Sequence, residues 1–478
     1  MHDIIIIGAG ITGVSIAREL SKYKGDILLL EKNLEACQET TKANSAIAHG
    51  GYDCQPGTLK AKLNVWGLDL LKDLSEEVGF TFKQTGSMVL AFDDCEIIKL
   101  EDLLEKGREN GVKNLRIIDK EEILQIEPRV SSKVVKALYC PQAGVVDPFN
   151  YCYGQLENAI ENGVIFITEC KVTGISKKGD AIELETTKGT FLTRYLINAG
   201  GLYSDRIAAM AEDYDFKILP TKGSYKLLDK VKGQELGTVL FQTPTEKGKG
   251  VLVTPTYDGN LMVGPTSERV EDPEDTRADK KSFETLEALG RKSVEDVDFS
   301  KTIRVFTGVR AKPDTGDFMI YPSKHIKGLI HVGGIESPGL VSAPAIAKYI
   351  VEILEKEGAN LVKKEDFNPI RRPIKRINAM TLEERQEAIR ANPAYGRIIC
   401  RCETVSEAEI VDAIRRPGGA VTVDGVKRRV RAGMGRCQGG FCGPKVIEIL
   451  ARELGIDPVD VRKELLGSNI ARNHIKGI

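Results

Sequence analysis

The sequence predicts an α/β domain with a parallel sheet, joined to further domains that include a small C-terminal unit. At 478 residues the chain is too long for one hydrophobic core, so two or three domains are expected. Its first 30 residues follow a strand, glycine turn, helix and strand pattern, which is typical of a parallel sheet. Residues 367–478 contain 21 Lys and Arg against 13 Asp and Glu, whereas the preceding residues are net acidic. This change in composition predicts a domain boundary near residues 360–396.

The opening pattern consists of four consecutive elements. Residues 3–7 form a short apolar run of the kind that a buried parallel strand needs. A glycine turn at residues 8–13 leads into a helix expected over residues 14–23, and a second strand is expected over residues 26–30. Glu31 follows that strand directly. A strand, a helix and a second strand in this order are the start of a nucleotide-binding fold.

The turn is a Gly-x-Gly-x-x-Gly motif in which each glycine has its own physical role. Gly8 permits the tight turn, Gly10 lets the backbone approach a pyrophosphate, and Gly13 allows close packing of helix on strand. The free N–H groups at the helix N-terminus favour the negative charge of a pyrophosphate. Glu31, 18 residues after Gly13, is placed to bind ribose hydroxyls. With its flanking elements, the motif predicts a dinucleotide site.

Two later junctions favour FAD over NAD. Residues 195–205 and 329–340 each read as a strand, a glycine turn and a helix. Three separated segments that converge on one elongated ligand suit a flavin lying across the switch point of a sheet. The alternative is that both junctions are ordinary turns. The candidate FAD contacts in them are Ala199, Gly200, Gly334, Gly339 and Leu340.

Residues 44–52 and the following Pro-Gly-Thr-Leu-Lys-Ala motif at 56–61 carry a family resemblance. With the glycine junctions, they make the first 360 or so residues resemble the D-amino acid oxidase-like superfamily of FAD enzymes, with glycerol-3-phosphate and L-2-hydroxyglutarate dehydrogenases most similar. The resemblance implies that Asn44 and Ser45 also contact FAD. A hairpin expected over residues 250–264 agrees with the antiparallel sheet of that superfamily. The implied fold is an α/β FAD-binding Rossmann-like domain from 1–80, 145–215 and 325–360, and an α+β substrate domain with an antiparallel sheet from 81–144 and 216–324.

Composition narrows the possible partners and locations. The 68 Lys and Arg balance 69 Asp and Glu, so net charge gives no indication of nucleic acid or a membrane surface. The longest purely aliphatic stretch, residues 4–7, is far shorter than the roughly 20 residues of a membrane-spanning helix. No signal peptide fits the N-terminus. We therefore expect a cytoplasmic protein with no transmembrane segment and no nucleic-acid partner.

Oxidation of an alcohol by a flavin needs a base for the hydroxyl proton and cations that hold an anionic substrate. His49 is the leading base, because it is one of five histidines and lies in a glycine-rich stretch near the expected flavin; a histidine bonded in the core is the alternative. Arg310 is the leading anion clamp, since guanidinium binds phosphate or carboxylate bidentately and related enzymes have a substrate-facing arginine in this segment. Lys222 is a second candidate cation, with a surface lysine as the alternative. Weaker candidates are Tyr225, Tyr257 and Lys312.

Four of the ten cysteines form two close pairs near the C-terminus: Cys400, Cys402, Cys437 and Cys442. Their spacing is C-x-C, then 34 residues, then C-x4-C, and thiolates that converge indicate a metal site. Zinc prefers a C-x2–4-C start. The pattern resembles the small bacterioferritin-associated ferredoxin-like (BFD-like) domain, which implies a mainly helical unit over 396–450 that holds a [2Fe–2S] cluster. Zinc and unligated thiols are the alternatives.

The residues around these cysteines carry three further expectations. Residues 361–395 are expected to be a linker with a short helix over 382–391, and residues 451–478 an amphipathic helix with a frayed end. The basic run at residues 427–431 is expected to offset the charge of a cluster, to dock an acidic electron-transfer partner, or to be a solvated face. It lacks the interleaved aromatic residues of a nucleic-acid site.

The whole chain most resembles the catalytic subunit of the anaerobic type of glycerol-3-phosphate dehydrogenase, in which a flavin domain carries a ferredoxin-like tail. The resemblance implies an FAD-dependent dehydrogenase that passes electrons through a [2Fe–2S] cluster to a partner subunit, a reductase or a quinone. A location peripheral to the membrane would then follow from a partner. The alternatives are an L-2-hydroxyglutarate dehydrogenase, an oxygen-using amine or amino-acid oxidase with a zinc-binding assembly tail, and a non-catalytic flavoprotein.

Overall fold

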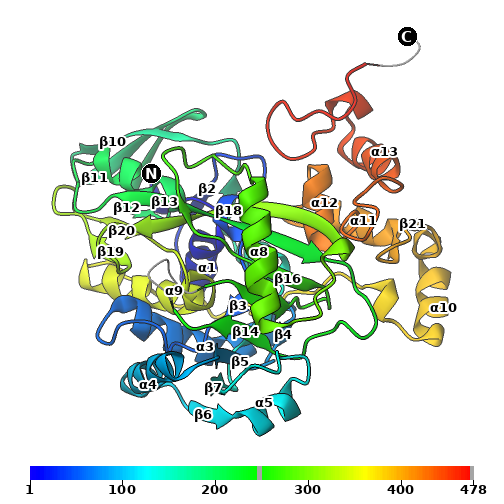
Figure 1. The fold of residues 1–478 in the computed structure, drawn as a ribbon. Coiled ribbons are helices and arrows are strands. Elements are labelled where there is room, and N and C mark those ends of the chain that lie inside the picture. The colour runs from blue at the N-terminus through cyan, green and yellow to red at the C-terminus, as the bar shows by residue number, and fades with distance from the viewer. Residues whose placement is uncertain (245–249, 474–478) are drawn as a thin grey trace.

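The computed structural model of the chain describes residues 1–244 and 250–473. Within these residues the fold has two large sheets and a smaller C-terminal unit made mainly of helices (Figure 1). The C-terminal unit, orange to red in Figure 1, lies at one side of the two larger parts. This arrangement agrees with the α/β, α+β and helical C-terminal parts that the sequence predicts.

The first sheet has a parallel centre built from the opening strands. β1 (His2–Ile7) pairs in parallel with β2 (Ile27–Leu30) and β12 (Gly189–Asn198), and β12 also pairs in parallel with β20 (Leu329–Gly333). Residues 4–7 are all buried, as expected for an apolar run covered on both faces. The strand order is β10-β11-β12-β1-β2-β9, with β20 beside β12 and β19 beside β20. The other strands are β9 (Ile165–Ile167), β10 (Val172–Lys178), β11 (Ala181–Thr186) and β19 (Met319–Pro322).

Helices cover this sheet and bury its two cores. The larger core lies between the sheet and four helices that pack on one another, while α7 (Ser204–Ala209) contributes Ile207 to the core on the other side. The short α2 (Glu39–Lys42) lies in the connection between β2 and β3 (Ile47–Ala48). The four helices are α1 (Ile11–Leu20), α3 (Leu59–Val78), α6 (Pro148–Glu161) and α9 (Gly339–Lys356).

The second sheet has the order β17-β13-β16-β15-β14-β5-β7-β6, with β18 beside β13. All neighbouring pairs are antiparallel except β14 and β5, and the predicted hairpin is formed by β15 and β16. A separate three-stranded sheet joins β3 to β8 (Gly144–Val146) and β4 (Phe82–Lys83). The strands of the second sheet are β5 (Ser87–Ala91), β6 (Arg116–Asp119), β7 (Lys136–Cys140), β13 (Ile218–Leu228), β14 (Val239–Gln242), β15 (Leu252–Pro255), β16 (Leu261–Gly264), β17 (Glu268–Arg269) and β18 (Thr302–Pro313). The helices in these segments are α4 (Asp94–Glu109), α5 (Lys120–Ile126) and α8 (Lys280–Ser293).

The C-terminal unit has a hydrophobic core of its own, centred on fully buried residues such as Ile410 and Leu450. The linker before it contains α10 (Leu382–Ala391), which agrees with the predicted short helix and starts with a capping box between Thr381 and Glu384. The elements of the unit are β21 (Ile398–Cys400), β22 (Val405–Ser406), α11 (Glu407–Arg415), α12 (Val423–Val430) and α13 (Gly443–Leu454).

The structure differs from the sequence prediction at two boundaries. The third segment of the FAD-binding domain was predicted to begin at residue 325, but β19 begins at Met319 and already pairs with β20 of the first sheet. The helix expected over residues 451–478 is not formed: α13 ends at Leu454, because Gly455 adopts the left-handed conformation that terminates helices. A short 3-10 turn and irregular chain follow through residue 473, and residues 474–478 lie outside the described part. Among the described residues, no helix is long and apolar enough to cross a membrane.

Candidate active site and cysteine pairs

The glycine motif forms a turn that only glycine can form. Gly8 has a φ of +97°, and a Cβ on it would lie 2.5 Å from the carbonyl oxygen of Ala199. A Cβ on Gly13 would lie 1.9 Å from the carbonyl oxygen of Gly8, so α1 packs directly on the turn. At the start of α1, the N–H of Ile11 donates to Thr41 Oγ1 at 3.0 Å. Thr41, which was not predicted from the sequence, adds a hydroxyl to the helix end predicted for the pyrophosphate.

Glu31 follows β2 and is buried beside the glycine turn. Its Oε2 accepts a hydrogen bond from the N–H of Ala9 at 2.8 Å, and its Oε1 accepts from the backbone N–H and the side-chain amide of Asn33, each at 2.9 Å. Burial raises the pKa of Glu31, and the hydrogen bonds from Asn33 and Ala9 oppose this rise. The backbone thus orients the carboxylate at the edge of the cavity described next.

A cavity of about 1580 Å³ runs between the two large sheets. Its volume exceeds the ≈ 300–1,000 Å³ of ordinary small-molecule sites, which suits a dinucleotide together with a substrate. Gly13 and Gly334 do not line it; a Cβ on Gly334 would lie 2.7 Å from the Pro313 ring, so this glycine serves the turn after β20. The predicted residues that do line the cavity are Gly8, Gly10, Glu31, Asn44, Ser45, His49, Ala199, Gly200, Arg310, Gly339 and Leu340.

His49 follows β3 and faces this cavity. Its Nε2 lies 3.3 Å from Ser337 Oγ, in the loop between β20 and α9. Its carbonyl oxygen accepts a hydrogen bond from Asn64 Nδ2 at 2.7 Å, which fixes the backbone, and its ring lies 5.8 Å from that of Phe241. Ser337 was not predicted from the sequence. When Ser337 donates to Nε2, that nitrogen is unprotonated and oriented to accept a proton.

Arg310, on β18, also lines the cavity. Its Nη2 donates to the carbonyl oxygen of Thr266 at 3.3 Å, and it has no ion pair within 4.0 Å among residues 1–244 and 250–473. Tyr225, on the neighbouring β13, bonds Ser45 Oγ at 3.2 Å; burial raises its pKa, and the positive charge of Arg310 opposes the rise. Lys312 lies two residues further along β18 and lines the cavity as well. This side of the cavity therefore carries positive charge suited to an anion.

Lys222 does not reach the cavity. Successive side chains of a strand point to opposite faces of the sheet. Thr221, the preceding residue of β13, lines the cavity, so the side chain of Lys222 lies on the opposite face. Its Nζ lies 3.4 Å from Asp275 Oδ2 and 3.5 Å from Glu268 Oε2. The expectation that Lys222 holds the substrate is therefore corrected, because its charge is already paired and it lies outside the cavity.

The four C-terminal cysteines form two pairs in space. The Sγ atoms of Cys402 and Cys437 lie 3.6 Å apart at the surface, whereas Cys400 and Cys442 are buried. A hydrogen bond with Cys442 lowers the pKa of Cys400 to about 6. No three His, Cys, Asp or Glu side chains among the described residues converge on a single ion. Two thiol pairs fit a two-iron cluster, in which each iron takes two cysteines, better than one tetrahedral zinc.

The basic run at residues 427–431 is not a solvated face. The exposed fractions of Arg428, Arg429 and Arg431 are 3%, 1% and 6%. Arg431 pairs with Glu403 Oε2 at 2.8 Å and donates to the hydroxyl of Tyr257 at 3.2 Å. The three arginines therefore pack the C-terminal unit against the rest of the chain and are not available to an acidic partner. Tyr257 belongs to this contact.

Comparison with known proteins agrees with the architecture. Residues 3–353 match the family model described as FAD dependent oxidoreductase. The chain belongs to this FAD-dependent oxidoreductase family. Residues 398–452 match the model described as BFD-like [2Fe-2S] binding domain, so the oxidoreductase carries a [2Fe–2S]-binding unit at its C-terminus. The prediction of both cofactors, FAD and a [2Fe–2S] cluster, is confirmed.

Two relatives and one solved structure show which members of the family this oxidoreductase is similar to. A glycerol 3-phosphate dehydrogenase of Caloramator mitchellensis is 46% identical over 98% of each chain. The mitochondrial L-2-hydroxyglutarate dehydrogenase of Homo sapiens is 32% identical over 55% of this chain and 60% of its own. The structure of an L-alpha-glycerophosphate oxidase from Mycoplasma pneumoniae with FAD bound has a TM-score of 0.74 and 32% identity, over 77% of this chain and 98% of its own.

Proposed function

We propose that this oxidoreductase oxidises sn-glycerol 3-phosphate to dihydroxyacetone phosphate. The observation that carries the proposal is the placement of Arg310, a cation with no ion-pair partner among the described residues, in the same cavity as His49. Similarity of 46% identity over 98% of the chain to a glycerol 3-phosphate dehydrogenase supports this substrate over a dicarboxylate, since the L-2-hydroxyglutarate dehydrogenases of Homo sapiens and Arabidopsis thaliana are only 32% and 27% identical over 55% and 73% of the chain.

The chemistry divides between the cofactor and the side chains. Bound FAD supplies the hydride acceptor. Arg310 binds the phosphate through charge-assisted hydrogen bonds, and Lys312 adds positive charge on the same face of β18. His49 Nε2 accepts the proton of the C2 hydroxyl, which takes the place of Ser337 Oγ as its partner. The glycine turn, Glu31, Thr41 and the start of α1 bind the nucleotide half of the cofactor.

The four C-terminal cysteines would hold the [2Fe–2S] cluster, which would supply one-electron transfer next to a two-electron flavin. The exposed position of Cys402, together with Phe441, which has 83% of its area exposed and precedes Cys442, supports electron exit on this side to a separate acceptor protein or partner subunit. We place the enzyme in the cytoplasm, where it reaches a membrane quinone through such a partner.

The test is anaerobic reduction of the flavin absorbance band in the purified holoenzyme. Glycerol 3-phosphate, L-2-hydroxyglutarate and glycine are compared under identical conditions, so that the phosphate ester, the 2-hydroxy acid and an amino acid each represent one candidate. Fast bleaching by the phosphate ester alone supports the proposal. Bleaching by L-2-hydroxyglutarate or glycine alone refutes it. The same assay is applied to Arg310→Met, which should lose fast bleaching by glycerol 3-phosphate. Lys222→Met is its matched control, because Lys222 is a cation on the neighbouring strand β13 whose side chain lies outside the cavity.

A further inference from the structure

The C-terminal unit contacts the part of the FAD domain that carries the cofactor contacts. Residues 31–44, here called the β2–α2 segment, run from Glu31 to Asn44, and most of them line the cavity. Two residues in this segment other than glycine have positive φ, Cys37 at 61° and Glu39 at 52°. Such conformations persist only where the surroundings hold them. The contacts that hold this segment therefore bear on FAD binding.

Glu35 lies in the middle of the segment and is bound by the C-terminal unit. Its Oε2 accepts a hydrogen bond from Arg429 Nη1 at 2.7 Å, and each of the two side chains is only 1% exposed. Its Oε1 accepts from Thr422 Oγ1 at 2.7 Å and from the N–H of Val421 at 3.0 Å. Burial raises the pKa of Glu35, but the charges of Arg429 and Arg428 hold it below its ordinary value, so the carboxylate is ionised.

Tyr153, on α6, joins the same contact. The Arg429 guanidinium lies 3.7 Å from the centre of its ring, and its hydroxyl accepts a hydrogen bond from Arg428 Nε at 2.9 Å. The same hydroxyl donates to the carbonyl oxygen of Ala36 at 3.5 Å. The two arginines of α12 thus reach the backbone of the β2–α2 segment through Tyr153 as well as through Glu35.

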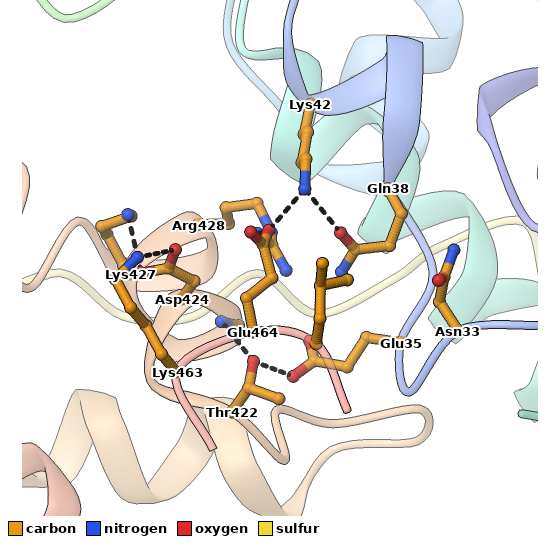
Figure 2. Close-up of polar contacts among 12 residues, drawn as sticks. Asn33, Glu35, Gln38, Lys42, Thr422, Asp424, Lys427, Arg428, Lys463 and Glu464 are labelled. Carbon is orange, nitrogen blue, oxygen red and sulfur yellow. Dashed lines mark hydrogen bonds and ion pairs between the residues drawn. The ribbon is translucent and has the colours of Figure 1, made fainter. Parts of the chain in front are cut away.

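A second ion pair holds the end of the segment. Lys42, in α2, donates to Glu464 Oε1 at 2.7 Å and to Gln38 Oε1 at 3.1 Å (Figure 2). Glu464 also accepts from Arg428 Nη1 at 2.6 Å. Since Thr41 precedes Lys42 and binds the first N–H of α1, this ion pair lies next to the predicted pyrophosphate site.

We propose that the [2Fe–2S]-binding unit is part of the FAD site, with Arg429 and Glu464 as positioning residues that hold the β2–α2 segment in its FAD-binding conformation. FAD affinity then depends on docking of the C-terminal unit, whichever substrate the enzyme oxidises. Removal of one partner of a buried ion pair leaves an uncompensated charge, so the segment is expected to move when Arg429 is lost.

The test measures the dissociation constant of FAD in full-length Arg429→Met and Glu35→Gln, by titrating FAD into the apoprotein and following flavin fluorescence. Arg371→Met is the matched control. Arg371 pairs with Glu157 Oε2 at 2.6 Å, and both side chains are 2% exposed. Among the described residues, the other side-chain partners of this pair are Val78 and Arg416, neither of which belongs to the β2–α2 segment, so Glu157 keeps one cation when Arg371 is lost. We expect the FAD dissociation constant to rise about tenfold in the first two variants and to stay within about twofold in the control.

Thermal unfolding with and without FAD separates positioning from general stability. A purely structural role lowers the midpoints of apo- and holoprotein together, whereas weaker FAD binding also shrinks the rise in midpoint that FAD produces. If both buried variants lose stability but keep the wild-type FAD dissociation constant, the proposal is wrong.

Two milder variants keep the test decisive if the buried ones do not fold. Lys42→Met removes a partly exposed ion pair, with side chains 27% and 20% exposed, and Glu464→Gln also removes the partner of Arg428. Both variants are expected to raise the dissociation constant about threefold. Unchanged FAD affinity in both would overturn the proposal. Bleaching of the FAD-saturated variants by glycerol 3-phosphate is read separately, so the substrate assignment can fail without affecting this result.

Discussion

A single methyl group at Gly425 should disrupt the contact between α12 and Glu35. Gly425 is in the first turn of α12, and a Cβ on it would lie 2.1 Å and 2.3 Å from the two carboxylate oxygens of Glu35. Alanine in a helix normally stabilises by up to about 1 kcal/mol relative to glycine. Here the carboxylate is held by Arg429 and Thr422 and cannot retreat without loss of those bonds.

The magnitude follows from two opposing effects. Overpacking a filled site costs about 1–3 kcal/mol, and expulsion of Glu35 from its buried ion pair costs about 3–5 kcal/mol. Either cost exceeds or cancels the gain in helix propensity. We therefore expect Gly425→Ala to lower the free energy of unfolding by up to about 4 kcal/mol, whereas an ordinary helical Gly→Ala change raises it by up to about 1 kcal/mol.

The assay is thermal unfolding of the full-length holoprotein, followed by near-UV circular dichroism. Gly443→Ala is the control, because Gly443 begins α13 and a Cβ there meets nothing within 4 Å. The double variant Glu35→Asp/Gly425→Ala should recover part of the loss, since the shorter side chain makes room, and a coupling above about 0.5 kcal/mol would show this. A Gly425→Ala protein more stable than wild type, as an ordinary helical Gly→Ala change would make it, would refute the described fit between α12 and Glu35.

Four other predictions test the site and its surroundings. Arg310→Met should raise KM for glycerol 3-phosphate about 10–100-fold in steady-state assays, because a charge-assisted hydrogen bond is lost; an unchanged KM argues against the phosphate role. His49→Asn should slow flavin reduction about 10²–10⁴-fold in stopped-flow traces, and a wild-type rate would exclude His49 as the base. Cys402→Ser should remove the iron–sulfur absorbance but leave flavin reduction intact, and loss of both would contradict two separate sites. Burial lowers the pKa of His331, so stability should fall as the pH drops below about 6.5, where the unfolded chain binds a proton that folded His331 resists; His331→Gln should flatten this fall.

Local chemistry explains why the nucleotide turn could be predicted. The roles of Gly8 and Gly13 depend on the backbone conformation of the turn and on helix packing against it, and the Gly-x-Gly-x-x-Gly motif predicts both. Thr41 binds Ile11 across 30 residues, and no periodic pattern announces such a pair. The cysteine spacing predicted a metal site, and the [2Fe–2S] cluster followed from the resemblance of that spacing to the BFD-like domain.

Charged residues were the hardest to assign, because a sequence does not name their partners. The run at residues 427–431 was expected to offset the charge of a cluster, to dock an acidic partner or to be a solvated face, yet Arg429 pairs with a carboxylate 394 positions earlier, at Glu35. Lys222 was misplaced because strand side chains alternate, and one residue of register decides which face a lysine occupies. The final helix was an error of another kind, since Gly455 and Pro458 were available as stop signals.

The two thiol pairs differ in their access to solvent, and this difference gives the electron path a direction. Cys400 and Cys442 are sealed inside the C-terminal unit, whereas Cys402 is open to water. Solvent exposure is one of the factors that set the reduction potential of an iron–sulfur centre. When a cluster is bound, the thiolates of Cys402 and Cys437 would be more accessible to molecular oxygen, chelators and redox partners than those of Cys400 and Cys442. The face that suits electron delivery is therefore also the face at which oxidative damage should begin.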